Sequence, residues 1–578
     1  MKFLLLAFTS FISAAFFMAA TSRVAETEKK IVLNKIKRTG IRCSPLLADF
    51  DFTDTSSTIP LLRGWGSYEM PVTAGNDSAR IYFEQGINMY YGFHIIEALA
   101  SFERSVQLDS NFAMGYWGMA LSYGPNINDF GYSASPAALT AMARSKQLSA
   151  TAGPLEKALI EAMQVRYSPD STKIREDLNQ LYAAAMKKVY AKFPGDGDAG
   201  ALYADALMVQ HPWDLYSKTY VERPWTPEII HTLENILSAH PEHPGAGHYY
   251  IHAVEASAHP EKALAVSRKL GANMPGVAHI VHMPSHIFIR SGYYREGLQS
   301  NETAVKGYYD YLGKFPSVAN NSPLYLIHNL HMQATCANMA GDYASSMKSS
   351  MDSRNSFDSS YLSIPDYMGM FMQYVYMTPV LTQIRFGKWD DILRLPRVST
   401  GYVYADYILH YAKGLAYARK KDFAGASAQL DSLSKIMEAP QLSAPAPSYA
   451  NPAIAGAEVA KKILQGVIAE EKKQLPQAIG FLKAAVVLED SMVYNEPKDW
   501  VHPARQYYGN VLLKAGQARQ SVTVFQEDLF INPNNGWSLT GLAIAQSALG
   551  KGAAAAATRV AAKKAFAGND IRITRPVF

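Results

Sequence analysis

Three short groups of histidines in the middle of the chain carry the strongest chemical signal in this sequence. They hold seven of its fifteen histidines, in the segments HYYIHAVE at 248–255, AHIVHMPSHIFIR at 278–290 and HNLHM at 328–332. Within each group the residues recur every three or four positions, which places them on one face of a helix. The residues with this spacing are His248, His252 and Glu255, then His279, His282 and His286, then His328 and His331.

This pattern leaves two interpretations open: a site for a transition metal ion, or polar groove residues that are hydrogen-bonded to tyrosine or backbone groups and bind no metal. Neutral imidazole is a good ligand for Zn, Cu, Fe and Ni ions. Only two cysteines occur, Cys43 and Cys336, so paired-cysteine zinc sites are excluded. Three histidines and one open position form the catalytic type of metal site, in which Glu255 can serve as a further ligand or as the general base.

The elements that position these histidines repeat along the chain. His248 and His282 are separated by the same interval as His252 and His286, namely 34 residues. From Ser78 onward the hydrophobic residues recur with a helical period, and almost no stretch alternates as a strand does. The sequence therefore predicts an all-α superhelix of helix-turn-helix units with irregular inserts.

The helical units resemble the tetratricopeptide repeat (TPR). In the first unit Ala98 takes repeat position 20 and Phe102 position 24, and similar units cover most of residues 78–566. The segments HYYIHAVEASAHPEKAL, HIVHMPSHIFIRSGYY, HNLHM and YNEP are similar to a group of secreted bacterial TPR proteins with a His-rich central block. This resemblance implies an α-solenoid whose first helices line a concave surface.

The TPR resemblance also implies where the site residues lie. Counted from Gly292 and Gly341 as position 15, the histidines take positions 2, 5 and 9 of three adjacent units, and Arg290 takes position 13. These positions face the groove in TPR proteins. We therefore expect metal ligands at His248, His252, His282, His286 and His331, with Glu255 and Arg290 as catalytic groups, Arg290 as an anion clamp, and Trp213, His279 and His328 as ligand-binding residues.

Two functions remain open from these residues. The first is an exported TPR scaffold that binds a peptide, protein or glycan in a His-lined concave groove. The second is a metal-dependent hydrolase or oxidase with Zn, Cu or Fe in that groove. Glu496, Trp500 and His502 in YNEPKDWVHP are weaker candidates that could contribute across the superhelix.

The N-terminus predicts export. One lysine precedes an apolar run from Phe3 to Met18, followed by small residues, as in a secretory signal peptide. We therefore expect a periplasmic or secreted protein with no transmembrane segment in the mature chain. The expected division is signal peptide 1–20, irregular arm 21–77, TPR-like repeats 78–240, His-rich TPR block 241–350, C-terminal TPR repeats 351–566 and tail 567–578.

The charge and the motifs argue against other classes of function. The formal net charge is +5, and the one dense run of basic residues, at 29–38, follows the predicted signal peptide. We therefore expect no nucleic-acid partner. The phosphate-binding pattern GxxxxGK[ST] and the serine-hydrolase pattern GxSxG do not occur.

Overall fold

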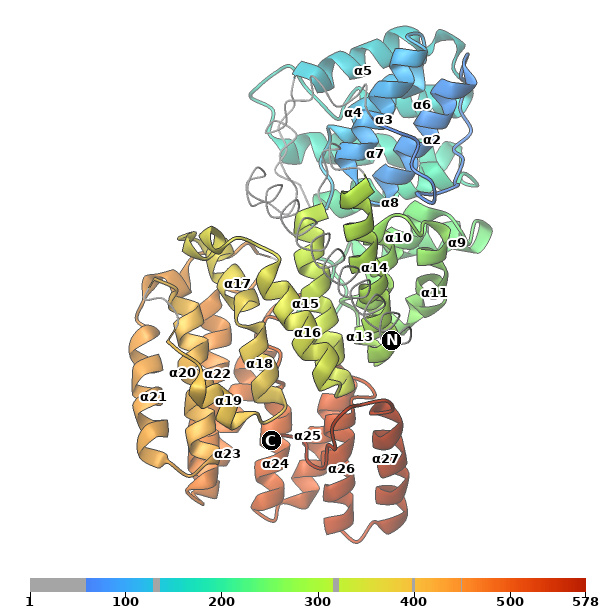
Figure 1. Ribbon diagram of the computed structural model, residues 1–578. Helices are drawn as coiled ribbons and strands as arrows, with labels where there is room; N and C mark the ends of the chain where they lie inside the picture. The colour runs from blue at the N-terminus through green and yellow to red at the C-terminus, as the bar shows by residue number, and fades with distance from the viewer. Residues whose placement is uncertain (1–58, 128–135, 315–321, 398–400, 449) are drawn as a thin grey trace, which may run out of the picture.

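The computed structural model describes residues 59–127, 136–314, 322–397, 401–448 and 450–578, and this part of the chain is almost entirely α-helical. Within these ranges an isolated bridge joins Tyr216 and Glu222. Successive helices pack against each other as hairpins (Figure 1). The predicted all-α fold of TPR-type helix-turn-helix units is therefore confirmed. The predicted signal peptide, most of the predicted arm and Cys43 lie outside the described residues.

The N-terminal helices show how the local sequence sets this packing. Asn76 begins α2, because its side chain accepts hydrogen bonds from the N–H groups of Ser78 and Ala79. Helices α2 and α3 meet at the buried Phe102, and a Cβ atom at Gly86 would lie 2.6 Å from its ring. A glycine opposite a large side chain thus brings the two helices close. The helices here are α2 (Asp77–Tyr91), α3 (Ile95–Leu108), α4 (Ala113–Ser122), α5 (Pro136–Leu148), η3 (Ser149–Thr151), α6 (Pro154–Met163), α7 (Arg175–Lys192), α8 (Gly197–Gln210) and α9 (Thr226–Ala239).

The histidine-bearing segments form the middle of the chain. Pro284 divides the segment 278–290 into two short helices, because proline lacks the N–H group that a continuous helix needs. Gly292 then turns the chain with a φ of +78°, a conformation that other residues rarely adopt. The helices here are α10 (Pro244–Val254), η4 (Pro260–Ala263), α11 (Leu264–Asn273), α12 (Ala278–His282), α13 (Pro284–Arg290), α14 (Tyr294–Lys314), α15 (Ser322–Ala340) and α16 (Tyr343–Asn355).

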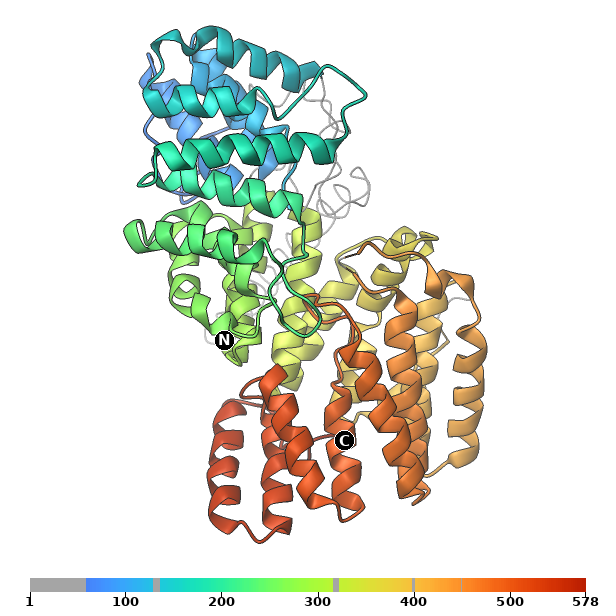
Figure 2. The ribbon, with the colours of Figure 1, turned by 180° about the vertical axis from the view of Figure 1, so that it is seen from behind.

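The C-terminal helices curl back toward the middle of the chain. Figures 1 and 2 both show α26 and α27 next to the ends of α15 and α16, and the indole N–H of Trp537 donates to the carbonyl of Asn338 at 3.1 Å. The helices here are η5 (Ser359–Ser363), α17 (Tyr367–Tyr376), α18 (Thr378–Arg385), α19 (Trp389–Arg394), α20 (Val403–Arg419), α21 (Phe423–Ile436), η6 (Pro440–Ser443), α22 (Ala453–Glu471), α23 (Leu475–Asp490), α24 (Ala504–Lys514), α25 (Ala518–Ile531), α26 (Gly536–Ala548) and α27 (Gly552–Ala565).

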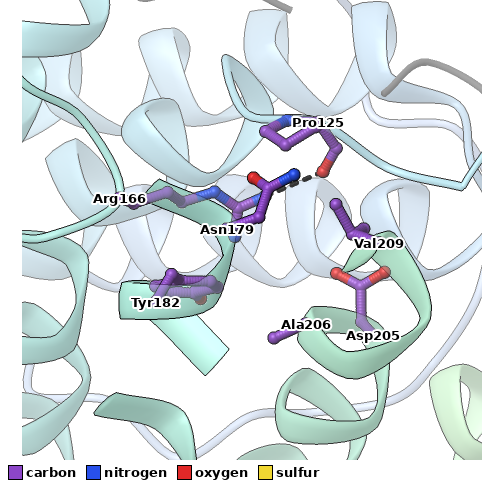
Figure 3. Close-up of a pocket in the computed structure, with 7 residues that line it drawn as sticks. All are labelled: Pro125, Arg166, Asn179, Tyr182, Asp205, Ala206 and Val209. Atoms are coloured by element: carbon purple, nitrogen blue, oxygen red, sulfur yellow. Dashed lines mark hydrogen bonds between the residues drawn. The ribbon is translucent and has the colours of Figure 1, made fainter. Parts of the chain in front are cut away.

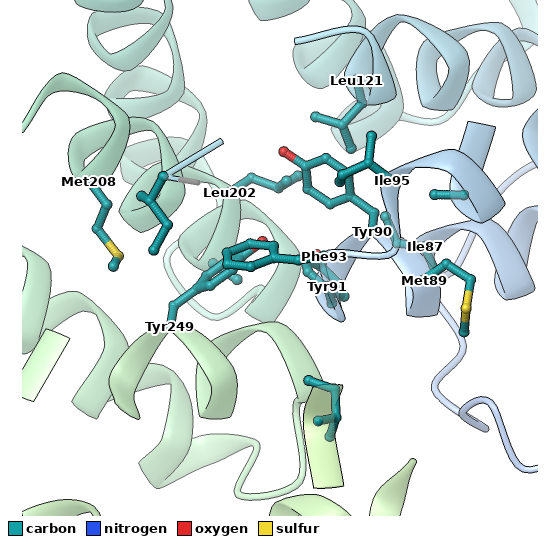
Figure 4. Close-up of a cluster of buried hydrophobic side chains, with 14 of the residues drawn as sticks. Ile87, Met89, Tyr90, Tyr91, Phe93, Ile95, Leu121, Leu202, Met208 and Tyr249 are labelled. Atoms are coloured by element: carbon teal, nitrogen blue, oxygen red, sulfur yellow. The ribbon is translucent and has the colours of Figure 1, made fainter. Parts of the chain in front are cut away.

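The hydrophobic core of the N-terminal half reaches the histidine block. Tyr90, Tyr91 and Phe93 at the end of α2 pack with Tyr249 of α10 (Figure 4). This contact joins the first helical hairpin to the first His-bearing helix, so the block rests on a rigid support. No helix of the described ranges combines the length and the apolar character needed to cross a membrane.

A small polar cavity lies in the same half of the molecule, between α7 and α8 (Figure 3). It is lined by Pro125, Arg166, Asn179, Tyr182, Asp205, Ala206 and Val209. The buried guanidinium of Arg166 donates to the carbonyl of Pro125 at 2.9 Å and lies 4.4 Å from the centre of the Tyr182 ring. Asp205 instead accepts from the hydroxyl of Tyr90 at 2.9 Å.

Candidate metal centre

Three helical segments and one loop bring the predicted residues together. Helix α10 carries His248 and His252 one turn apart, and Glu255 follows at its end. Helices α12 and α13 carry the second group of histidines, and α15 carries the third. The loop between α23 and α24 adds Glu496, which lies far away in the sequence.

Among the described residues, three sets of side chains have ligand atoms close enough to hold a metal ion. In each set the candidate atoms lie within 4.8 Å of one another. We name them the His286 triad (His282, His286 and His328), the His248 triad (His248, His252 and His279) and the carboxylate site (Glu255, His286 and Glu496). His286 belongs to two sets, so it is the centre of the arrangement.

The Nε2 atoms of the His286 triad converge. His286 Nε2 lies 2.8 Å from His282 Nε2 and 3.4 Å from His328 Nε2. Asn301 fixes the orientation of His282: its Nδ2 donates to the carbonyl of Gly297 at 2.8 Å, and its Oδ1 lies 2.6 Å from His282 Nδ1. His282 Nδ1 is therefore the donor, and a neutral His282 presents the lone pair of Nε2 to the centre of the triad.

The opposite edge of His286 faces two carboxylates. Its Nδ1 lies 2.6 Å from Glu255 Oε2 and 2.5 Å from Glu496 Oε2. Burial acts to lower the pKa of His286, but the two carboxylates outweigh it and raise the pKa to about 10. The two nearby carboxylates thus favour the protonated form of the His286 ring.

The His248 triad is held in a similar way. His248 Nδ1 donates to the carbonyl of Tyr91 at 2.6 Å, and His252 Nδ1 lies 3.1 Å from Glu255 Oε1. Glu255 therefore contacts one histidine of each triad. Burial lowers the pKa of both His248 and His279 well below the ordinary value, so these two imidazoles are neutral.

The two triads occupy equivalent repeat positions. Each triad uses positions 5 and 9 of one unit and position 2 of the next unit. Positions 5 and 9 are His248 and His252 in the first triad, and His282 and His286 in the second. His279 and His328 fill that last position, so these predicted ligand-binding residues lie among the predicted metal ligands. A site therefore combines two adjacent units, with the ligands offset along the superhelix.

His331 lies outside the three sets. Its buried ring is 5.8 Å from that of Tyr374 and 6.4 Å from that of Phe371, measured between ring centres. The repeat explains this position, because Thr335 stands where a third triad would need a histidine at position 9. The structure thus does not bring His331 together with His248 and His282, the combination expected from equal repeat positions.

The structure also places Arg290, the predicted anion clamp. Its guanidinium donates to the carbonyls of Glu255, Ser257 and Ile531, each at 3.1 Å. These bonds tie the end of α10 to the end of α25, so Arg290 links these two helix ends. Trp213 lies beside the site: its N–H donates to the carbonyl of Ile127 at 2.8 Å, and its ring and that of His252 meet edge to face with their centres 5.2 Å apart.

The site is enclosed rather than spread along an open groove. Five of the six triad histidines are at most 5% exposed, and His328 is partly exposed. The cover comes from the C-terminal half, which contributes Glu496 and the carbonyl of Pro533, the acceptor of a 2.9 Å bond from Tyr294. Local sequence patterns gave only a weak signal for Glu496, in YNEP, and none for Asn301.

Comparisons with known proteins give only distant similarity. No protein-family model matches the chain, and no curated protein matches it. It is similar to the human IFIT1 dimer with m7Gppp-AAAA, at 12% identity and a TM-score of 0.29, over 86% of this chain and 92% of that chain. It is also similar to yeast Tom70, at 9% identity and a TM-score of 0.27, over 82% and 90% of the two chains. Similarity at this level carries no argument about function.

Proposed function

We propose that this chain is an exported TPR-type scaffold that binds a transition metal ion, Zn, Cu or Fe, at the His286 triad and uses it as a metal-dependent hydrolase or oxidase. The observation that carries this proposal is the convergence of three imidazole Nε2 atoms, with His282 and His286 oriented by groups behind them. Three imidazoles with one open side are the ligand set of a catalytic site rather than of a structural one.

The groups behind the ligands support the same proposal. Histidines that bind metal ions commonly donate their other ring N–H to a carboxylate or an amide oxygen, which fixes the ring and makes the ligand more basic. Asn301 occupies that place behind His282, and Glu255 and Glu496 occupy it behind His286. Core histidines that only fill space do not need this arrangement.

The fit to an ion is also a question of charge. Two buried carboxylates are costly unless a cation lies close to them. In the metal-free protein that cation is the His286 imidazolium, and its Nε2 proton occupies the region between His286 and His282. A metal ion held there by His282, His286 and His328 would take the place of the proton and keep a positive charge beside Glu255 and Glu496.

Substrate access is best at His328, the partly exposed member of the triad. A bound ion supplies Lewis acidity there and lowers the pKa of a coordinated water, or supplies redox chemistry if it is Cu or Fe. The chain's own residues hold the ligands, exclude water on the closed side and keep two carboxylates next to a ring N–H. A peptide, protein or glycan ligand would reach the site from the His328 side.

The test is the metal content of protein prepared without an affinity tag. We expect the double variant His282→Gln and His328→Gln to lose one equivalent of transition metal that the unchanged protein and His331→Gln, the matched control on α15, retain. Circular dichroism should show that both variants fold. Absence of metal after incubation with Zn²⁺, Cu²⁺ and Fe²⁺ would refute the proposal. Activity is then sought with an ester and phosphoester panel and with an oxygen electrode.

A further inference from the structure

We propose that a second transition metal ion binds at the His248 triad, so that the protein holds two ions linked through Glu255. The site is separate from the His286 triad, and its argument does not depend on the proposed enzymatic function. The carrying observation is a set of ring nitrogens that face one another deep in the protein without hydrogen-bond partners.

The protonation pattern of the His248 triad follows from its contacts. His248 donates its Nδ1 proton to the carbonyl of Tyr91, and His252 donates its own to Glu255 Oε1. The Nε2 atoms of both rings therefore carry lone pairs, and neither has a hydrogen-bond partner in the described part of the chain. His279 has no such partner at either ring nitrogen.

Such an arrangement is costly without an occupant. The three rings are 0%, 5% and 3% exposed for His248, His252 and His279, so water does not reach them freely. A buried polar atom that has lost its water partner and gained no other destabilises the folded protein. Here several such atoms lie within 4.8 Å of one another, and one bound cation satisfies all of them at once.

The rings are also held in place from outside. Phe93 lies 4.4 Å from the His248 ring and stacks at 5.9 Å on that of His252, measured between ring centres. Tyr325 stacks on His279 at 4.3 Å. These contacts fix the three rings before an ion arrives, which lowers the entropic cost of binding.

The repeat provides an independent argument. The His248 triad and the His286 triad use the same positions of successive TPR-type units, and each has a polar group behind its position-5 histidine: the carbonyl of Tyr91 for His248 and Asn301 for His282. Both position-9 histidines contact Glu255. The three histidines and the contacts that orient them are thus repeated in the two triads, which indicates that both triads bind the same kind of ligand.

The ligand set favours copper. The His248 triad offers three neutral imidazoles, and its nearest carboxylate, Glu255, uses Oε1 for His252. Imidazole is a suitable ligand for copper, and the monovalent copper ion costs less to bury than a dication. The two triads lie side by side. The ring centres of His252 and His286 are 5.9 Å apart, as are those of His279 and His282, so the two ions would be neighbours.

The experiment measures metal stoichiometry in the full chain without a tag, after dialysis against Cu⁺ under reducing conditions and, separately, against Zn²⁺. We expect two equivalents of copper in the unchanged protein and in His331→Gln, and one equivalent in both His279→Gln and His282→Gln. Anomalous scattering at the copper edge from crystals of the unchanged protein should give two peaks, a measurement that does not depend on the folding of a variant.

The outcomes separate this inference from the proposed function. One equivalent that is lost in His282→Gln and retained in His279→Gln, together with one anomalous peak, would overturn the second site and leave the first intact. Two equivalents of zinc but one of copper would overturn the preference for copper. The absence of any bound metal would overturn both proposals.

Discussion

Metal binding at the His286 triad is expected to release one proton for each ion bound. The two carboxylates raise the pKa of His286 to about 10 against the opposing effect of burial, so this ring is protonated at both nitrogens near neutral pH. Burial lowers the pKa of His328 to about 3 and that of His282 well below its ordinary value, so these rings are already neutral. An ion that binds all three Nε2 atoms must therefore displace the Nε2 proton of His286.

The displaced proton sets the size of the effect. While His286 is protonated in the metal-free form, the apparent affinity should rise tenfold for each pH unit, which is about 1.4 kcal/mol, and the rise should end as the pH approaches about 10. Isothermal titration calorimetry with Zn²⁺ in buffers of different ionisation enthalpy gives the number of protons directly. A second ion at the neutral His248 triad adds none.

The result that would refute this reasoning is an affinity independent of pH between about pH 7 and pH 9 with no proton released. Glu496→Gln provides a directional control, because the loss of one of the two carboxylates lowers the pKa of His286 and so ends the pH-dependent range at a lower pH. His331→Gln, which changes a buried histidine outside the triads, should leave the proton count as it is.

Three further predictions concern the supporting structure. Asn301→Ala removes the acceptor behind His282 and should weaken metal binding about 10- to 100-fold in equilibrium dialysis; unchanged affinity would contradict the assigned role. Phe102→Ala empties the fully buried contact between α2 and α3 and should cost about 3–5 kcal/mol in urea unfolding, with metal content retained. Burial raises the pKa of Asp205 to about 6. Between about pH 4 and pH 6 the folded protein therefore binds more protons at Asp205 than the unfolded chain does, so the free energy of unfolding falls as the pH rises through this range. Asp205→Asn keeps an acceptor for the hydroxyl of Tyr90 and should remove this fall, so that the free energy of unfolding at pH 8 rises by about 2–3 kcal/mol. A variant that is less stable at pH 8 would contradict this and show that the negative charge of Asp205 stabilises the buried Arg166.

The helical units and the position of the site were predictable because their signals are local. Helical periodicity, the spacing of His248 with His252 and of His282 with His286, and turn residues such as Gly292 all lie within one or two units. These features are set by backbone geometry and by contacts between neighbouring helices. The sequence therefore identified the candidate ligands before any contact was known.

The grouping of those ligands was not predictable from spacing alone. His248, His282 and His331 all take position 5 of their units, which suggested that they share an ion. In the structure, the histidines at positions 5 and 9 of one unit instead lie close to the histidine at position 2 of the next unit. The rotation between units, which depends on packing along the whole superhelix, decides which imidazoles meet. The position of Glu496 depends in addition on the C-terminal half curling back, and no local pattern encodes that curvature.

The cover over the centre has a consequence for biosynthesis. Glu496, Ile531 and Pro533 reach the histidine block from the far end of the chain, through contacts with His286, Arg290 and Tyr294. A ribosome releases these residues only after almost the whole chain has been made. The enclosed form of the centre therefore requires residues up to Pro533, and an ion that bound there would be enclosed only after these residues had been synthesised.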